Sequence, residues 1–263
     1  MRDYHAGWLL LFSPPMTLDL FRTDAYLRDC EARVLRADAD GVVLDRTVFY
    51  PLGGGQAGDA GVLRLADGAE LAIVDTRKGK DAEGRPTAEI VHVPAAGQEA
   101  LLARLAAGDT VTARIDWERR HRLMRFHTAT HLLCHLVAQP VNGCSITPEY
   151  ARLDFHMTDP LDKELLTQGL ARLVGEAHAL TVGAITDAEL DANPTLVKSM
   201  SVQPPRGTGT VRTIRIGDGE SPIDLQPCGG THVANTQEIG AVLVTKIEKK
   251  SATTRRVVLG WAG

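Results

Sequence analysis

Short runs of alternating apolar and polar residues dominate the first part of the chain, from residue 30 to residue 115. Alternation with a period of two is typical of strands that bury one face. Turn-forming residues separate the runs at positions 38–41, 66–68 and 78–86. The predicted strands are EARVLRA, GVVLDRTVFY, AGVLRLA, ELAIVDT, AEIVHV and DTVTARI. Six short strands at this spacing predict a small barrel or sandwich.

The pattern changes after residue 116, where apolar residues recur at helical intervals. Residues 117–138 contain neither Gly nor Pro, and Pro140 ends the run. The positions that repeat at helical spacing are Leu123, Phe126, Thr130, Leu133 and Val137. Two further helices are predicted over residues 162–179 and 187–193. Strands are predicted again near the C-terminus, with the sequences VRTIRI, GAVLVTKIE and TTRRVVLGW.

These patterns predict an α+β protein with two domains, for which a chain of 263 residues is long enough. The first is a β-rich, barrel-like domain over residues 16–115. The second, over residues 116–263, is an α+β domain in which an antiparallel sheet packs against helices. Residues 1–15 precede a more ordinary globular sequence that opens at Met16, so we interpret them as an N-terminal extension or as the product of a start placed too early.

The composition narrows the class of protein. Apolar residues make up 44% of the chain and charged residues 24%, with a formal net charge of -4, as in soluble globular proteins. This near-neutral total argues against a strongly basic nucleic-acid coat, although a local basic patch is compatible with it. The four widely spaced cysteines are expected to be reduced thiols. Because the apolar run at residues 8–12 is too short for a membrane span, we expect a cytoplasmic protein that engages no membrane.

The stretch HTATHLLCH, residues 127–135, places three histidines on one predicted helix. His127 and His131 lie one turn apart and could point at one ion, and His131 and His135 could do the same. All three could not readily do so, because eight residues span about 12 Å of helix axis. Zinc ligands must converge within about 2.0 to 2.3 Å of the metal. One histidine is therefore surplus, and the spacing leaves open which one.

A second pair of candidate ligands, Cys228 and His232, lies in the sequence PCGGTH. Together the two pairs supply up to four nitrogen and sulfur donors, a set that suits zinc better than magnesium or calcium. Pro227 and the two glycines indicate a tight turn, where bare backbone could approach a ligand and offer amides to an oxyanion. Two interpretations remain: a closed structural zinc clamp, or a catalytic site with room for water or substrate.

The sequence YPLGGGQAGD, residues 50–59, carries three successive glycines between predicted strands. By itself, this run of glycines indicates a flexible hairpin or bulge. It lacks the Lys-Ser/Thr of a P-loop and the G-x-G-x-x-G spacing of a dinucleotide site, which disfavours nucleotide binding of those two kinds.

Basic residues form two clusters in the sequence. Such clusters more often lie on a solvent-exposed face than in a binding site. Both clusters flank the ligand pairs in sequence, as a polyanion-binding rim would require. They are Arg119, Arg120, Arg122 and Arg125, and Lys246, Lys249, Lys250, Arg255 and Arg256.

The order of the GGGQ turn, HTATH at the head of a helix and CGGTH near the end resembles the editing region of alanyl-tRNA synthetase. It also resembles the free-standing relatives of that region, the AlaX-type alanyl-tRNA editing proteins. The similarity covers about residues 16–257 and includes FYPLGGGQAGDAG, DWERRHRLMRFHTATHLL, GCSITPEYARLDF and LQPCGGTHVANTQEIG. The chain has no obvious room for an aminoacylation domain, so a stand-alone editing protein of intermediate length is the nearest match.

The resemblance implies an ATP-independent hydrolase that cleaves the ester joining a wrong amino acid, chiefly serine and also glycine, to alanine tRNA. The family's zinc ligands, which also form its catalytic site, fall on His127, His131, Cys228 and His232. Cys134 and His135 are then left as packing residues. For the partners we expect serine- or glycine-charged alanine tRNA and a monomer or weak dimer.

The resemblance also implies a substrate pocket. The glycine-rich motif falls on Gly53, Gly54, Gly55 and Gln56, which would place Gln56 near the pocket. Asn142 stands where relatives carry a polar pocket residue. For the partner of the serine hydroxyl we expect Asn142 or a threonine of the first helix, Thr128 or Thr130. Cys144 precedes Ser145 where relatives often have glycine, a departure that leaves the detailed shape of the pocket open.

Three rival functions remain. The related editing domain of threonyl-tRNA synthetase would act on serine-charged threonine tRNA, but the GGGQ segment favours the alanine system. A metal-dependent peptidase is disfavoured because Thr128 stands where the H-E-x-x-H motif has glutamate. A zinc-stapled tRNA-binding module would be the non-catalytic alternative.

Overall fold

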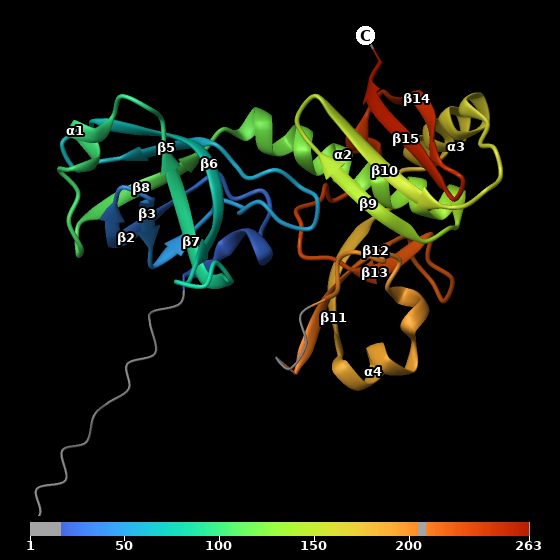
Figure 1. Cartoon of the computed structure of the whole chain (residues 1–263), viewed down its shortest axis with the longest axis horizontal. Coiled ribbons are helices and arrows are strands. Elements are labelled where there is room, and N and C mark those ends of the chain that lie inside the picture. Colours follow the sequence, from blue (N-terminus) through green and yellow to red (C-terminus); the bar gives the residue numbers. More distant parts are fainter. Residues whose placement is uncertain (1–16, 205–208, 263) are drawn as a thin grey trace, which may run out of the picture.

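The computed structural model of the chain describes residues 17–204 and 209–262. The predicted N-terminal extension, residues 1–15, lies outside the described residues. The protein has the predicted α+β architecture, with a barrel in the first part of the chain and antiparallel sheets with helices in the second (Figure 1).

Six strands form a closed barrel in the order β2-β3-β7-β6-β5-β8. Their bounds are β2 Asp29–Asp38, β3 Gly41–Leu44, β5 Gly61–Arg64, β6 Glu70–Lys80, β7 Pro86–Pro94 and β8 Thr110–Ile115. Every second residue of β8 is buried, as the alternating pattern predicts. The barrel interpretation is confirmed over the sandwich, and closure pairs both edges of the sheet.

Two details of the barrel differ from the prediction. The predicted strand over residues 41–50 breaks after Leu44, because the Asp45 carboxylate accepts a hydrogen bond from Arg33 N–H at 2.8 Å and interrupts the ladder. A short strand β4 (Arg46–Thr47) then pairs in parallel with β1 (Leu18–Asp19). The predicted loop at 78–86 is shorter than expected, because β6 and β7 continue to pair as far as Lys80 and Pro86.

Helix α2 (Trp117–Val137) runs from the barrel into the second part of the molecule (Figure 1). The Asp116 carboxylate caps its first turn by accepting a hydrogen bond from Arg119 N–H. Ala138, in the left-handed region with φ 52°, ends the helix before Pro140. The prediction for this helix is confirmed. No helix among the described residues combines the length and the apolar character that a membrane crossing needs.

A four-stranded antiparallel sheet packs against α2 and α3. Its order is β14-β15-β10-β9, with bounds β9 Val141–Ile146, β10 Tyr150–His156, β14 Val242–Ser251 and β15 Thr254–Trp261. Helix α3 (Lys163–Gly175) ends four residues before the predicted limit, and Ala177 follows with φ 56°. Strands β14 and β15 agree with the prediction, whereas β9 and β10 were not predicted.

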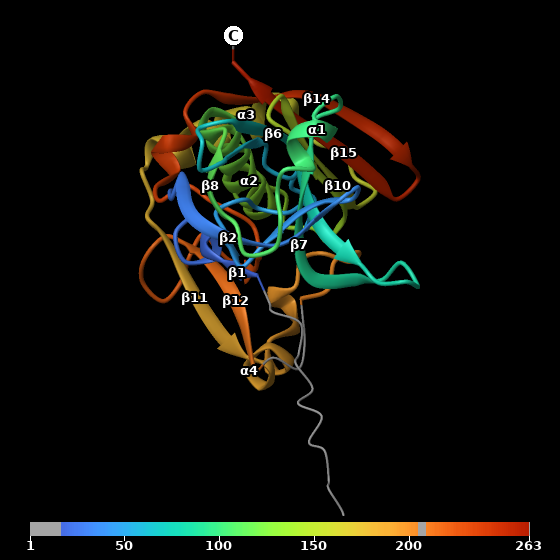
Figure 2. The same ribbon diagram turned by 90° about the vertical axis from the view of Figure 1, so that its left-hand side faces the viewer.

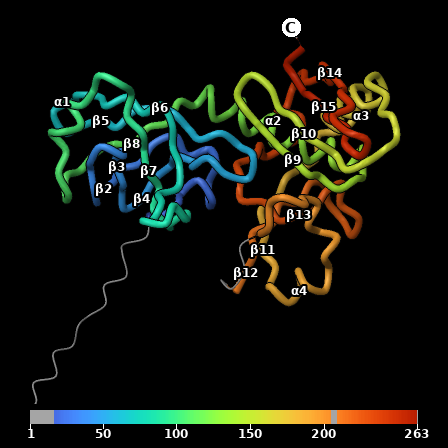
Figure 3. Tube along the Cα trace, viewed as in Figure 1, coloured from blue at the N-terminus to red at the C-terminus, as the bar shows by residue number. Residues whose placement is uncertain are grey.

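A second, three-stranded sheet protrudes with α4 from the four-stranded sheet (Figures 2 and 3). It consists of β11 (Leu180–Thr186), β12 (Thr210–Ile216) and β13 (Asp224–Pro227). Five of the seven residues of β11 are exposed, so β11 has no alternation to reveal it and is held by its ladder with β12. The remaining helices are α1 (Glu99–Leu102), α4 (Asp187–Ala192) and 3-10 turns at Leu20–Arg22, Pro194–Leu196 and Thr236–Ile239.

The two parts of the chain have separate apolar cores. One fills the barrel and draws on residues 32–115, and the other lies between the four-stranded sheet, α2 and α3 and draws on residues 123–259. Trp117, at the start of α2, packs against both cores. The division into domains at residue 115 stays a prediction.

A fully buried ion pair joins α2 to the barrel region. Arg120 Nε lies 3.1 and 3.0 Å from the two carboxylate oxygens of Asp59, and Arg120 Nη2 also donates to Asp59. Arg120 further donates to Ala25 O at 2.9 Å and to Val48 O at 2.6 Å, and Tyr50 N donates to Asp59 at 2.6 Å. Both charges are therefore satisfied without water, the condition under which a buried pair is tolerated.

We predict that Arg120→Ala lowers the free energy of unfolding by about 3 to 5 kcal/mol, because Asp59 is left as an unpaired buried charge. Urea denaturation followed by circular dichroism measures the loss. The matched control is Arg122→Ala on the same helix, whose pair with Glu118 is exposed. The control should change stability by no more than about 0.5 kcal/mol. Equal losses in the two variants would contradict a special role for the buried pair.

Candidate metal centre and its cavity

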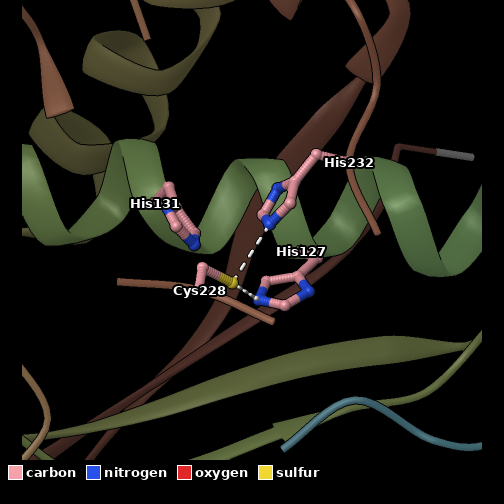
Figure 4. Close-up of side chains that lie close together, drawn as sticks. All are labelled: His127, His131, Cys228 and His232. Atoms are coloured by element: carbon pink, nitrogen blue, oxygen red, sulfur yellow. Dashed lines mark hydrogen bonds between the residues drawn. The ribbon is translucent and has the colours of Figure 1, made fainter. Parts of the chain in front are cut away.

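Four nitrogen and sulfur side chains meet at one point of the structure. His127 and His131 come from α2, and Cys228 and His232 come from the turn that follows β13 (Figure 4). Their potential ligand atoms all lie within 4.8 Å of one another. Cys228 Sγ is 3.4 Å from His127 Nε2 and 3.2 Å from His232 Nε2. Tetrahedral zinc with its usual bond lengths would separate neighbouring ligand atoms by about 3.3 to 3.6 Å, so the donor set fits such an ion.

The structure decides between the three histidines of the helix. His135 is exposed and takes no part in the cluster, whereas His127 and His131 are buried beside Cys228. The prediction that His135 packs inside the protein was wrong, because this position of the last helical turn faces solvent. Cys134 is buried as expected.

Each histidine of the cluster is oriented by a hydrogen bond at Nδ1. The three contacts are His127 to Gln56 Oε1 at 2.7 Å, His131 to Asp224 Oδ2 at 2.8 Å and His232 to Thr128 Oγ1 at 3.2 Å. An acceptor at Nδ1 holds the ring proton there and leaves the Nε2 lone pair free for a cation. In the neutral rings, the three Nε2 lone pairs are thus on the side where the cluster meets.

Gln56 of the GGGQ turn connects the barrel region to the metal cluster. Besides its contact with His127, its amide donates to Thr231 Oγ1 at 2.9 Å and accepts from Thr231 N at 3.2 Å. Gly55, with φ +86°, lies against β9, where an added Cβ would be 2.8 Å from Cys144 Sγ. Gln56 is fully buried behind His127, so it positions a candidate ligand, whereas Gly53 and Gly54 line the adjoining cavity.

Gly230 lies in close contact with His127. A Cβ at this position would be 2.1 Å from His127 Cε1 and 2.4 Å from Nδ1. The glycine of the CGGTH turn is therefore required for a close approach of backbone to a candidate ligand. At Gly229, by contrast, an added Cβ would meet only the end of the Arg22 side chain, at 3.3 Å.

The electrostatics of the cluster favour a cation. Burial opposes ionisation of Cys228, but His127 and His232 outweigh burial and hold the thiol pKa well below its ordinary value. Burial also opposes ionisation of Asp224, yet the hydrogen bond from His131 lowers this pKa to about 2. For His131, burial acts against protonation, and the hydrogen bond to Asp224 raises the pKa to about 9. A metal ion would therefore displace a proton from His131 and compensate the anionic thiolate.

A cavity of about 320 Å³ adjoins the cluster. His127, His131 and Cys228 form part of its wall, so these groups border an open space. Thr130 also lines the cavity, and its hydroxyl donates to His127 O at 2.7 Å. A space of this size has room for a substrate beside the ligands, as the catalytic interpretation requires, whereas the four protein donors by themselves would complete a tetrahedral ion.

Thr128 and Asn142 are not among the residues that line this cavity. The Thr128 hydroxyl is engaged by His232 and by Val233 N at 3.3 Å. The Asn142 amide donates to Thr254 Oγ1 at 3.4 Å, and its carbonyl oxygen is buried without a partner among the described residues. Of the three polar residues expected to meet the substrate hydroxyl, Thr130 alone reaches the cavity.

Sequence reasoning missed Asp224 and its partners. The Asp224 carboxylate binds His131, accepts from Gln226 Nε2 at 2.8 Å and pairs with Lys198. It lies on β13, a strand of four residues that is too short to show a period. In the sequence, the one indication of a role for Asp224 is its position four residues before the candidate ligand Cys228.

Comparisons with known proteins agree with this fold and site. Residues 211–258 match the model described as "Threonyl and Alanyl tRNA synthetase second additional domain", and residues 23–119 match that for "tRNA synthetases class II (A)". The chain is 31% identical to the alanyl-tRNA editing protein AlaX-M of Saccharolobus solfataricus over 92% of this chain and 98% of that protein. For AlaX-M of Methanosarcina acetivorans the identity is 33%, with the same two coverages.

A third relative is the alanine--tRNA ligase of Ignicoccus hospitalis, which is 33% identical over 89% of this chain. The chain spans only 25% of that ligase. Fold, site and matches together define the class of editing domains that accompany threonyl- and alanyl-tRNA synthetases. Within this class the chain belongs to the family of alanyl-tRNA editing proteins, which are aminoacyl-tRNA hydrolases.

We predict that Gly230→Ala weakens metal binding by about tenfold or more, because the new Cβ displaces the His127 ring. Titration with cobalt(II), followed by its absorption spectrum, measures the affinity. Gly229→Ala is the control, since its Cβ meets only a flexible side-chain end. If both variants bind the metal as well as the wild type, the close contact has no bearing on the site.

Proposed function

We propose that the protein is a zinc-dependent trans-editing enzyme that deacylates mischarged alanine tRNA, chiefly seryl-tRNA(Ala) and also glycyl-tRNA(Ala). The observation that carries the proposal is the set of four nitrogen and sulfur donors, three of which, His127, His131 and Cys228, lie on the wall of the cavity. The relatives that carry the name alanyl-tRNA editing protein support the choice of tRNA. We expect the enzyme to act as a monomer or weak dimer in the cytoplasm, where tRNA is charged.

The proposed zinc site consists of His127, His131, Cys228 and His232. When bound there, zinc supplies a Lewis acid that lowers the pKa of a water molecule or polarises the ester carbonyl. Gln56, Asp224 and Thr128 keep the three imidazoles in the tautomer that such binding needs.

We infer that Thr130 selects serine over alanine. Its hydroxyl proton is donated to His127 O, so its oxygen keeps lone pairs that can accept from a substrate hydroxyl in the cavity. A serine side chain gains this hydrogen bond, whereas the methyl group of alanine gains nothing.

Two other functions are weaker candidates. The matching family model covers the threonyl as well as the alanyl system, which keeps seryl-tRNA(Thr) as an alternative substrate. A non-catalytic zinc-stapled tRNA-binding module would not require a cavity beside its metal ligands, so the observed cavity makes this alternative weaker.

We predict that the protein releases serine from seryl-tRNA(Ala) far faster than buffer and faster than it releases alanine from alanyl-tRNA(Ala). A filter assay with radiolabelled amino acid measures the rates, with seryl-tRNA(Thr) tested beside them. Chelation should abolish release and added zinc should restore it, because the ester needs an activated water.

Two variants of α2 serve as controls for this assay. His131→Ala should remain folded by circular dichroism and lose deacylation, whereas His135→Ala, which removes an exposed imidazole, should keep it. Loss of the fold in His131→Ala would favour the zinc-stapled module. If the wild type releases serine from seryl-tRNA(Ala) no faster than buffer does, the proposed activity is wrong.

We predict that Thr130→Val reduces the preference for seryl- over alanyl-tRNA(Ala) by about fivefold, because one hydrogen bond of about 1 kcal/mol is lost while the side-chain shape is kept. The ratio of kcat/KM for the two substrates measures this preference. Thr130→Ser keeps the hydroxyl and should keep the preference. An unchanged ratio in Thr130→Val would remove this residue from the selection.

A further inference from the structure

The basic clusters that stand out in the sequence are largely engaged within the protein. Arg119 donates to Gly58 O at 3.2 and 3.0 Å, and Arg125 lies over the Trp261 ring at 4.2 Å. Arg256 binds the Asp154 carboxylate, and Lys246 pairs with Glu248. None of these side chains lines the cavity beside the metal cluster.

The cavity wall carries a different set of positive charges, contributed by four separate segments of the chain. They are Arg22, Lys78, Lys198 and Arg212. Among the described residues that line the cavity there is no aspartate or glutamate, although the chain as a whole has a net charge of -4. The cavity is thus a local concentration of positive charge in an acidic protein.

These four cations differ in how well they are paired. Lys198 is neutralised by Asp224, and Arg22 pairs with Asp19. Lys78 is half-buried, and its side-chain ammonium forms no ion pair or hydrogen bond with another described residue. Arg212 Nε is buried and has no partner among the described residues. Donors and charge are therefore available at Lys78 and Arg212.

Arg22, Lys78 and Arg212 line the same cavity, so their like charges oppose one another there. Burial lowers the pKa of Lys78 and the Arg22 charge lowers it further, while the Asp19 carboxylate that pairs with Arg22 acts in the opposite direction. An anion bound among Arg22, Lys78 and Arg212 would relieve this repulsion and replace the water that burial has removed.

This cation group adjoins the candidate metal ligands. Arg212 Nη1 donates to Cys228 O at 2.6 Å and to Gly230 O at 3.1 Å. Arg22 Nη1 lies beside Gly229, 3.3 Å from the position that a Cβ would take there. Two of the positive charges, Arg212 and Arg22, therefore lie next to the turn that carries Cys228.

We propose that Arg22, Lys78 and Arg212 bind the last phosphodiester of the charged RNA, the phosphate on the 5′ oxygen of the terminal ribose. The inference rests on the proposed function, in which the ester of that ribose lies at the metal cluster. The phosphate on the same ribose is then the nearest anionic group of the RNA. Contacts to it position the ester without reading a base, as phosphate contacts do in other nucleic-acid complexes.

The test is a binding measurement with an uncharged acceptor-stem RNA that ends in CCA, followed by fluorescence anisotropy. A second RNA carries an uncharged methylphosphonate at the last linkage only. The protein variants are Lys78→Ala and, as a matched control, Arg77→Ala. Arg77 is exposed on the same strand, and its side chain points to the opposite face, so its replacement removes the same charge outside the cavity.

For the wild type and Arg77→Ala we expect the methylphosphonate to weaken binding by about tenfold, which corresponds to one charged hydrogen bond. Lys78→Ala should bind the unmodified RNA about tenfold more weakly than the wild type does. The methylphosphonate should then reduce the affinity of this variant little further. The proposal fails if the methylphosphonate weakens binding equally in Lys78→Ala and the wild type, or if it has no effect on the wild type. Because no ester is present, this result is independent of whether the protein deacylates seryl-tRNA(Ala).

Discussion

The site depends on two contacts between helix α2 and residues 56–59, a segment that begins with the last residue of the GGGQ turn. Arg120 forms a buried ion pair with Asp59, and His127 forms a hydrogen bond with Gln56. The two contacts start from helix residues that are about 10.5 Å apart along the axis, seven residues at about 1.5 Å each, and they end on residues only three positions apart in the chain. Together the ion pair and the hydrogen bond hold α2 to this segment at two points, and the second of these points is the candidate ligand His127.

The cluster draws its components from several parts of the chain, and each part has a structural reason to be there. Helix α2 is buried between the sheet and α3 and presents two histidines one turn apart. The turn after β13 reaches the helix closely because Gly230 has no side chain. Asp224 on β13 and Gln56 from the barrel region then hold two of the imidazoles from opposite ends of the chain. A histidine pair on a helix becomes a candidate metal centre only through these distant contacts.

Part of the fold could be predicted because some elements bury a regular face: β6, β8 and β15 alternate with a period of two along much of their length. Helix α2 is buried on all sides over residues 126–134, and its prediction rested on the apolar residues at helical spacing and on the absence of Gly and Pro over residues 117–138. Strands β11 and β13 escaped prediction, since the first is mostly exposed and the second has four residues. Both are held by their ladders with β12, which are contacts between residues distant in sequence. The same limit hid Asp224, whose role exists only beside His131.

The sequence by itself determined the kinds of donor in the cluster and the family, because three separated motifs with fixed spacing carry both. Helix geometry also determined that one of the three helix histidines was surplus, and the resemblance pointed to His135. The tertiary structure showed His135 to be exposed and Thr130 to be the threonine that reaches the cavity. It also brought together Arg22, Lys78 and Arg212, which no sequence cluster contains. The physical reason is that periodicity in the sequence indicates which face of a single element is buried. A site, by contrast, depends on which side chains of several elements pack against one another.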